Sequence, residues 1–243
     1  MSAKVVYGVR PVSEALRAEG RVRRIYCAKE SRAPAVEGIV GQAKERGVRF
    51  DFVPQAKING LAGTQEHQGV AAVISPVAYT PLKDFLAACP PHAVVAVLDQ
   101  VQHPRNLGLL ARAAVGAGAA GLIVSQRGGA GADEAAVQAS AGALFHLPLI
   151  EAANTAQAIR TLQNHGFWVY GLDSDGAQSV FEISWADRSA IVLGNETRGL
   201  RPGVKKACDV VTRIPLAGGL DSLNVAVAGG IVLFQVISCR QSV

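Results

Sequence analysis

The stretch of sequence that decides the fold is residues 191–237, which read IVLGNETRGLRPGVKKACDVVTRIPLAGGLDSLNVAVAGGIVLFQVI. Two apolar runs in it, residues 191–193 and 210–216, are predicted to be strands, and each ends in a polar turn that contains glycine. The first turn is residues 194–199 and the second is residues 217–222. Glycine in such turns permits a positive φ or a close approach of the backbone to a ligand.

A long apolar segment, residues 223–237, follows the second turn and is predicted to be a helix. Asp221 or Ser222 stands where the N-cap of this helix is expected. Asn224 would then lie one turn inside an otherwise apolar helix, where an unpaired amide costs roughly 1–3 kcal/mol. We therefore expect Asn224 to have a partner in the protein or in a ligand. Two strand ends and a helix N-terminus brought together form a site of the kind that open α/β sheets use.

Polar side chains at these turns distinguish a binding site from ordinary connections between core elements. Glycine-rich turns are common, and either turn alone would be read as a simple connection. Glu196 and Arg198, however, follow the first strand, and Ser222 and Asn224 follow the second. A simple turn does not need these side chains, so we favour a functional site.

Three motifs in this chain resemble those of the SpoU-type RNA ribose methyltransferases, in the order that this family has them. Residues 194–200 (GNETRGL) resemble the second motif, and residues 214–228, from Ile-Pro-Leu to Ser-Leu-Asn-Val-Ala-Val-Ala, resemble the third. Asn106-Leu107-Gly108, with Arg112 downstream, resembles the first. The three motifs span about half of the chain, which makes the resemblance specific.

The resemblance implies a fold, a cofactor and a reaction. The implied fold is α/β, a SPOUT-type parallel sheet with a C-terminal trefoil knot, preceded by a small α/β RNA-binding domain. The implied cofactor is S-adenosylmethionine, held between the loops of the second and third motifs. Its matching positions in this chain are Gly194, Ile214, Leu216, Leu223 and Asn224. The implied reaction is methyl transfer to a ribose 2′-hydroxyl, in which the cofactor carries the activated methyl and the protein positions the reactants.

Arg112 is the residue that the resemblance places at the reacting hydroxyl. A guanidinium has a pKa above about 12, so we favour a role in fixing the adjacent phosphate and stabilising the forming alkoxide over a role as a base. Because Arg112 stands among alanines, we expect it to be partly buried; the structural alternative is a pairing with Glu196 or a backbone carbonyl. We expect Asn106 and Glu196 to shape the pocket around Arg112, and Ser222 and Asn224 to hold the ribose or the cofactor.

Composition is consistent with one large or two small globular domains. The chain has 243 residues, of which 49% are apolar, and no apolar run reaches the ~20 residues of a membrane span. No apolar signal segment opens the chain, so we expect a cytoplasmic protein without membrane contact. The four cysteines are far apart and the five histidines are scattered, which predicts free thiols and no metal site.

The positive charge of the chain lies in its first third. Residues 1–75 hold 12 Lys or Arg against 7 Asp or Glu, whereas residues 76–243 hold 12 of each. This excess suggests a contact with a polyanion, although a basic surface that only aids solubility has the same charge. The candidate phosphate contacts are Arg21, Arg23, Arg24, Lys29 and Arg32.

Alternating strands and helices divide the chain into three predicted parts. Residues 1–75 are predicted to form an α/β domain, with strands at 21–28, 48–53 and 70–74 and helices at 12–18, 36–46 and 58–62. Tyr7-Gly8 and His67-Gln68-Gly69 in this part resemble the accessory RNA-binding domain of one SpoU subgroup. The proline-rich residues 76–91 are predicted to be a linker with a helix at 82–89, and residues 92–243 the methyltransferase domain.

The methyltransferase domain is predicted to open with a βαβ unit. Residues 93–98 (AVVAVL) have the composition of a strand buried in a parallel sheet, followed by a helix at 109–118 and a strand at 121–125. Asn106 and Gly108 then stand at the helix start, where free backbone N–H groups favour an anion. A further helix is predicted at 133–143, a strand at 147–150, a helix at 155–165 and a strand at 167–172.

The function that these observations favour is 2′-O-methylation of a guanosine in 23S ribosomal RNA. A transfer RNA substrate and a non-catalytic RNA-binding protein on the same scaffold are the alternatives. Members of the family are homodimers whose active sites combine both chains. The apolar residues 223–237 fit such an interface, and they fit the core of a monomer as well.

Overall fold

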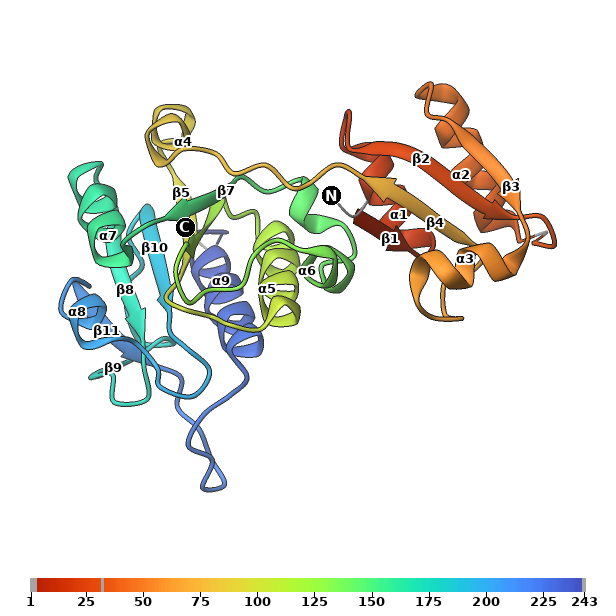
Figure 1. Cartoon of the computed structure of the whole chain (residues 1–243). Helices are drawn as coiled ribbons and strands as arrows, with labels where there is room; N and C mark the ends of the chain where they lie inside the picture. Colours follow the sequence, from red (N-terminus) through yellow and green to blue (C-terminus); the bar gives the residue numbers. More distant parts are fainter. Residues whose placement is uncertain (1–3, 32, 242–243) are drawn as a thin grey trace.

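A computed structural model describes residues 4–31 and 33–241 of the chain, and it contains two separate β-sheets (Figure 1). A four-stranded sheet carries the N-terminal third, drawn in red to orange, and a seven-stranded sheet carries the rest. Among the described residues, no helix is both long enough and apolar enough to span a membrane.

The N-terminal sheet is mixed, with the strand order β1-β4-β2-β3. Strand β4 pairs antiparallel with both β1 and β2, and β2 pairs parallel with β3. Ile25 and Cys27 of β2 pack with the apolar faces of α1 and α2, while Ala28 packs with Ile58 of α3. The sheet is therefore covered by helices on both faces. The elements are β1 (Lys4–Tyr7), α1 (Val9–Arg17), β2 (Val22–Ala28), α2 (Pro34–Glu45), β3 (Phe50–Val53), α3 (Gln55–Ala62) and β4 (Val70–Ile74).

The C-terminal sheet is parallel in all its pairings, with the strand order β7-β6-β5-β10-β8-β11-β9. Strand β5 is fully buried and lies between β6 and β10, so the chain winds outward from it in both directions. The predicted α/β class with a parallel sheet is thus confirmed. The strands are β5 (Ala93–Leu98), β6 (Gly121–Ser125), β7 (Leu149–Ala152), β8 (Trp168–Leu172), β9 (Gln178–Ser179), β10 (Arg188–Leu193) and β11 (Val210–Arg213).

Helices cover both faces of the C-terminal sheet and make three layers (Figure 1). Alternate residues of β5 show the division: Ala96 and Leu98 pack with α5, α6 and α9, whereas Val95 and Val97 pack on the other side with α4 and α7. Because helices bury both faces of β5, every residue of this strand is apolar. The helices are α4 (Leu82–Ala88), α5 (Pro104–Gly116), α6 (Glu134–Ala139), η1 (Ala143–Phe145), α7 (Thr155–Asn164), α8 (Pro202–Lys205) and α9 (Val225–Gln241).

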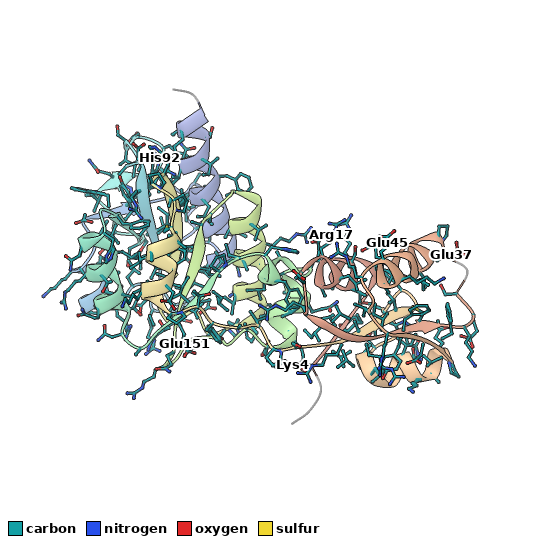
Figure 2. All side chains as sticks on the ribbon, turned by 90° about the horizontal axis from the view of Figure 1, so that it is seen from above. Lys4, Arg17, Glu37, Glu45, His92 and Glu151 are labelled. Atoms are coloured by element: carbon teal, nitrogen blue, oxygen red, sulfur yellow. The ribbon has the colours of Figure 1, made fainter. Side chains whose placement is uncertain are left out.

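The two sheets meet where α6 and η1 contact β1 and α1. The amide of Gln138 accepts a hydrogen bond from the Tyr7 backbone N–H (3.2 Å) and donates one to the Tyr7 carbonyl (2.9 Å). His146 lies 3.1 Å from Glu14. Gly142 has φ +88° and a Cβ there would lie 2.4 Å from the Glu14 side chain, so this contact requires glycine. Lys4, labelled in Figure 2, borders the same contact.

The structure corrects the predicted bounds of several helices, and α5, α6 and α9 show the reasons. Helix α5 begins at Pro104 rather than at residue 109, because proline with its fixed φ serves well in the first helical turn. Gly108 therefore lies inside the helix, where a Cβ would approach Ala136 O to 2.3 Å, so its role is close packing and not anion binding. Helix α6 is shorter than residues 133–143 because Asp133 caps its start and Gly142 turns the chain. Helix α9 runs to Gln241.

Candidate functional site

A cavity of about 670 Å³ opens at the carboxyl ends of β8, β10 and β11. It lies between the two glycine turns that the sequence singles out, at the edge where parallel sheets of this kind bind ligands. Its walls combine apolar side chains with backbone and polar groups, as ligand pockets do. The lining residues are 172–174, 193–199, 213–216 and 220–223, with Val225 and Ala228.

The loop after β10 is folded tightly onto itself. Asn195 and Gly199 exchange backbone hydrogen bonds of 3.0 Å in both directions, and Asn195 Oδ1 accepts from the backbone N–H groups of Thr197 and Arg198. A Cβ on Gly194 would lie 2.2 Å from the Gly199 carbonyl carbon. Gly194 is therefore required by the close approach of two backbone segments, and its own backbone is left facing the cavity.

Glu196 joins this loop to the segment after β5. Its carboxylate accepts hydrogen bonds from the backbone N–H of Gln102 (3.2 Å) and of His103 (3.3 Å), and from Asn106 Nδ2 (2.8 Å). Burial raises the pKa of Glu196, but the hydrogen bonds from Asn106 and from backbone groups outweigh it, so the net pKa lies below its ordinary value. Glu196 is thus held as an anion and fastens the first and second motifs together.

Asn224 joins the third motif to the same cluster. Its Nδ2 donates to Asn106 Oδ1 (3.1 Å), which confirms the expected partner for this amide. Its Oδ1 accepts from the backbone N–H of Ala226 (2.9 Å), so Asn224 caps α9. The predictions that Asp221 or Ser222 is the N-cap, and that Asn224 lies inside the helix, are therefore wrong. Asn106 is the meeting point of all three motifs.

The predicted cofactor and ribose positions lie around the cavity. Gly194, Ile214, Leu216, Ser222 and Leu223 line it directly. The cluster of Asn106, Glu196 and Asn224 holds the loops that form the walls; of these three residues, Glu196 also lines the cavity. The sequence motifs thus come together in space, from three separate segments.

The surroundings of Arg112 differ from those that the sequence predicts. The expectation of partial burial is wrong, because Arg112 is exposed on α5 and, among the described residues, it has no hydrogen-bond or ion-pair partner. Glu196 pairs with Asn106 instead. Arg112 does not line the cavity of its own chain. It shares one face of α5 with Leu109, whose side chain is also exposed.

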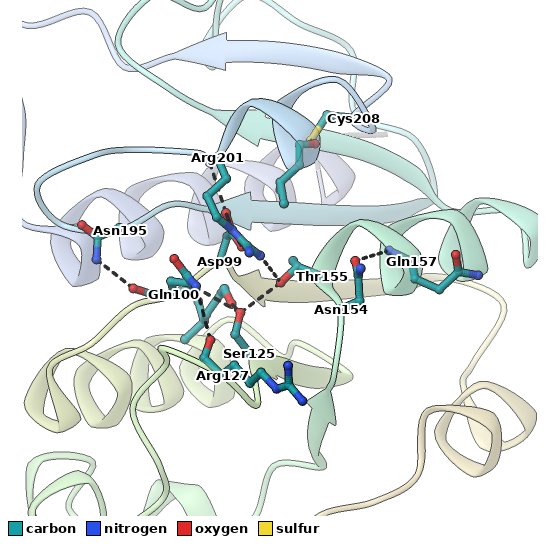
Figure 3. A network of polar contacts seen from close by, with 12 residues as sticks. Asp99, Gln100, Ser125, Arg127, Asn154, Thr155, Gln157, Asn195, Arg201 and Cys208 are labelled. Carbon is teal, nitrogen blue, oxygen red and sulfur yellow. Dashed lines mark hydrogen bonds and ion pairs between the residues drawn. The ribbon is translucent and has the colours of Figure 1, made fainter.

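Sequence reasoning missed an ion pair with a buried carboxylate, which supports the loop after β10 (Figure 3). Asp99, fully buried at the end of β5, accepts from Arg201 Nε (3.0 Å) and Nη2 (2.5 Å). Arg201 Nη2 also donates to Thr155 Oγ1 (3.2 Å), which lies 3.0 Å from Ser125 Oγ. The pair holds the far end of the loop after β10. The nearby Asn195 Nδ2 donates to the Gln100 carbonyl (2.9 Å), which adds a second fastening.

The turn after β8 is a further part of the cavity that the sequence motifs do not include. Leu172, Asp173 and Ser174 line the cavity. Asp173 Oδ2 accepts from the Leu200 backbone N–H (3.4 Å) and so contacts the loop after β10. A signal for these residues was present, because a polar turn that follows a parallel strand lies at the same edge of the sheet as the other turns.

The predicted phosphate contacts of the N-terminal part differ in whether they already have a partner within the chain. Arg24 is paired with Asp51 (2.5 Å) and lies over the Tyr26 ring. Arg21 donates to the Pro76 carbonyl (3.2 Å) and Arg23 to Ser75 Oγ (3.2 Å). Lys29 is exposed, and Arg32 lies outside the described residues. Of the four described cations, Arg21, Arg23 and Arg24 thus already have partners within the chain.

The four cysteines are free thiols, with Cys27 buried and Cys239 exposed. Burial raises the pKa of Cys27 to about 11 and that of Cys208 to about 12. Within the described part of the chain, no group of three or more His, Cys, Asp or Glu side chains is arranged to hold a metal ion.

Comparison with known proteins gives matches to both parts of the chain. A family model described as SpoU rRNA Methylase family matches residues 93–234, and one described as RNA 2′-O ribose methyltransferase substrate binding matches residues 5–80. The chain is 35% identical over 222 residues to the 23S rRNA (guanosine-2′-O-)-methyltransferase RlmB of Xylella fastidiosa, covering 90% of this chain and 89% of that protein.

Solved structures match along almost the whole chain. The SpoU methyltransferase AviRb from Streptomyces viridochromogenes, in complex with AdoMet, has a TM-score of 0.82 and 26% identity, and the match covers 98% of this chain and 90% of that one. An AdoMet-bound rRNA methyltransferase from Sinorhizobium meliloti has a TM-score of 0.80 and 27% identity, covering 99% of this chain and 88% of that one.

Proposed function

Because this chain belongs to the SpoU rRNA methylase family, we propose that it transfers the methyl group of S-adenosylmethionine to a ribose 2′-hydroxyl of a guanosine in 23S ribosomal RNA. The observation that carries the proposal is the Asn106 cluster, which brings the three family motifs together beside one cavity. The relative named for 23S rRNA matches over 90% of the chain, which favours ribosomal RNA over the alternative, transfer RNA.

The cavity fits the proposed cofactor. Its volume of about 670 Å³ lies within the range of roughly 300–1,000 Å³ that small-molecule pockets have. Ile214, Leu216 and Leu223 supply apolar walls for an adenine ring, and the exposed backbone at Gly194 supplies polar groups for its edge. When bound, S-adenosylmethionine supplies an electrophilic methyl group.

The residues of the chain have distinct roles in the proposed reaction. Ser222 lines the cavity, where it holds the ribose or the cofactor, and Asn224 fixes the start of α9 beside this segment. Asn106 and Glu196 hold these groups in place through the cluster. Arg112 fixes the phosphate beside the target ribose and stabilises negative charge on the attacking 2′-oxygen, which requires a guanidinium at the mouth of a cavity.

The position of Arg112 supports a homodimer whose active sites combine both chains. The faces of α5 and α9 beside it expose large apolar side chains, with Leu109 45%, Val227 53% and Phe234 52% exposed. Exposed apolar groups that cluster in this way mark interaction surfaces. A second copy packed there would cover them and bring Arg112 toward the cavity of the partner. The same proposal includes a trefoil knot, formed where the segment before α9 passes the loop after β10.

We further propose that the two parts of the chain are functional domains. Residues 1–75 are the RNA-binding domain, residues 76–91 the linker and residues 92–243 the methyltransferase domain. Support comes from the substrate-binding family model over residues 5–80 and from the separate N-terminal sheet. The linker includes α4, whose Phe85 packs onto the C-terminal sheet, and Val77 before this helix is buried as well, so the segment is packed rather than free.

Two experiments test the proposal. Calorimetry with S-adenosylmethionine separates an enzyme from an RNA-binding protein on the same scaffold, since only the enzyme needs the cofactor. Mapping of 2′-O-methyl sites in ribosomal and transfer RNA from cells with and without this protein then identifies the target. A loss of one methyl mark in 23S rRNA is expected; loss of a transfer RNA mark alone would favour the alternative substrate, and no binding of the cofactor would refute the enzyme.

Mixing of two inactive variants tests the composite site. Arg112→Ala keeps an intact cavity, while Gly194→Val blocks the cavity and keeps Arg112. In a mixed dimer, one site combines the good cavity with the good arginine, so random mixing returns about a quarter of wild-type activity for a symmetric dimer. An inactive mixture with mixed dimers present would place Arg112 in the site of its own chain.

A further inference from the structure

A second cavity, also of about 670 Å³, lies on the N-terminal part of the chain. It is formed by the turn from α1 to β2 and the turn from α2 to β3, so the last residues of both helices border it. Figure 2 labels these ends, Arg17 and Glu45, next to each other, with Glu37 at the far end of α2. The lining residues are 16–20, Val22, Arg23 and 46–49.

Four arginines line this cavity, namely Arg17, Arg23, Arg46 and Arg49, against a single acid, Glu19. Arg17 is partly neutralised by Glu14 (2.6 Å). Arg46 and Arg49 are exposed and have no side-chain hydrogen bond or ion pair within the described residues. Like charges held close together repel each other, so folding gains nothing from this arrangement.

Interaction with helix dipoles accounts for two of these four arginines. Arg17 and Arg46 stand at the carboxyl ends of α1 and α2, where a cation contributes about 0.3–1 kcal/mol. Arg23 lies in β2 and Arg49 just before β3, outside any helix. Gly20 and Gly47, with φ of +69° and +65°, turn the chain on either side and leave open space beside them. The result is an accessible, concave surface with an excess of guanidinium groups.

We propose that this cavity binds the phosphate backbone of the RNA substrate. The inference rests on the proposed function, and it deepens that function by placing an RNA contact on the end of α1 and α2. Guanidinium groups bind phosphate oxygens in a bidentate manner, and a concave surface lets several of them reach successive phosphates. Of the four described cations that the sequence suggested, only Arg23 lines this cavity; Arg17, Arg46 and Arg49 are new.

The experiment is a salt titration of RNA binding with the double variant Arg46→Gln/Arg49→Gln. Among the described residues these side chains have no hydrogen-bond or ion-pair partner, so the variant is expected to fold as the wild type does. The matched control is Lys83→Gln/Arg160→Gln, which removes the same charge from exposed positions on α4 and α7. Binding of a 23S rRNA fragment that carries the methylation site is measured between low and high salt, together with cofactor affinity and steady-state methylation.

The arginine variant should lose affinity and salt dependence together. Each lost phosphate contact reduces the slope of log K against log salt by about 0.7–0.9, so the double variant should show a reduction of about 1.4–1.8 and a roughly tenfold weaker affinity. The KM for the RNA should rise with it, while kcat at saturating RNA changes less than twofold. Arg46→Lys/Arg49→Lys should restore most of the slope, because lysine keeps the charge.

Several outcomes would overturn the inference. An unchanged slope and affinity in the glutamine variant would do so, as would an equal loss in the control pair. Should the double variant unfold, Arg49→Gln alone carries the test, with about half the slope change. The wild type separates this inference from the proposed function: if it methylates rRNA and only the variant prediction fails, the cavity is not the contact, whereas a wild type without methyl transfer refutes the function itself.

Discussion

Removal of Arg201 should destabilise the protein more than the loss of an exposed ion pair of the same length. In Arg201→Ala the Asp99 carboxylate, whose side chain is 0% exposed, loses the bonds from Nε and Nη2. Within the described part of the chain, it keeps only the backbone N–H of residue 201, at 3.2 Å. The Asp99 carboxylate is then left with one donor, at a position that is 0% exposed in the intact protein.

The magnitude follows from burial. Breaking a buried pair by removing one partner costs about 3–5 kcal/mol, because the remaining charge is uncompensated. The Arg201 side chain is itself 46% exposed, so solvent screens part of the attraction, and we expect about 3 kcal/mol. The double variant Asp99→Asn/Arg201→Ala buries no charge, and its amide oxygen can still accept from the backbone N–H. We therefore expect the double variant to be more stable than Arg201→Ala, at a loss of about 1–2 kcal/mol.

The control is Arg24→Ala. The Arg24–Asp51 pair has the same 2.5 Å separation as Arg201–Asp99, but its side chains are 50% and 37% exposed. Its loss should cost less than about 1 kcal/mol. Urea unfolding gives the free energies, and equal m-values across the variants validate the comparison. If Arg201→Ala were as stable as the control, or no less stable than the double variant, the claim that a buried charge anchors this loop would be wrong.

Three further predictions concern the loops around the cavity. The pKa of Glu196 is lowered in the folded state, so its contribution to stability should be complete above its unfolded value of about 4.5 and disappear as the pH falls through the folded pKa. The free energies of unfolding of the wild type and of Glu196→Gln, measured in urea between pH 3 and 7, should therefore converge at the acid end. Asn224→Ala removes the cap of α9 and the bond to Asn106, and should cost about 1–2 kcal/mol in unfolding free energy and slow methyl transfer; unchanged rates and cofactor affinity would reduce Asn224 to a packing role. Gly194→Ala forces the loop open, because its Cβ would lie 2.2 Å from the Gly199 carbonyl carbon, so cofactor binding by calorimetry should be lost while the sheet, followed by circular dichroism, is kept.

Much of the fold follows from local pattern. Strands β4, β5 and β6 have the bounds that the apolar runs predict, because each run is short, uninterrupted and limited by turn residues. Helix starts follow less directly from the apolar pattern. Pro104 marks the first turn of α5, but the apolar periodicity becomes clear only later in the helix. In the same way, the apolar residues from 223 onward gave no sign that Asn224 is the N-cap, since a hydrophobic pattern does not show where the first turn begins.

The site shows a sharper limit. The motifs named Asn106, Glu196 and Asn224, but their mutual contacts join positions 90 and 118 residues apart. The Asp99–Arg201 pair joins positions 102 residues apart, and the sequence around either residue contains no motif that predicts the pairing. A charged residue after a strand is usually solvated, so sequence alone gives no reason to bury it. Such pairs become visible only when the strand order brings the ends of β5 and β10 side by side.

Arg112 shows how one chain can carry a residue that its own cavity does not use. Asn106 and Arg112 lie six residues apart on α5, which separates their directions by roughly 120° around the helix axis. Asn106 points inward to Glu196, so Arg112 must point away from that cluster. A rotation of the helix that brought Arg112 to the cavity would break the bonds of Asn106 to Glu196 and Asn224. The proposed site needs both residues, so this arrangement favours a guanidinium from a second copy, docked against the exposed face of Leu109 and Phe234.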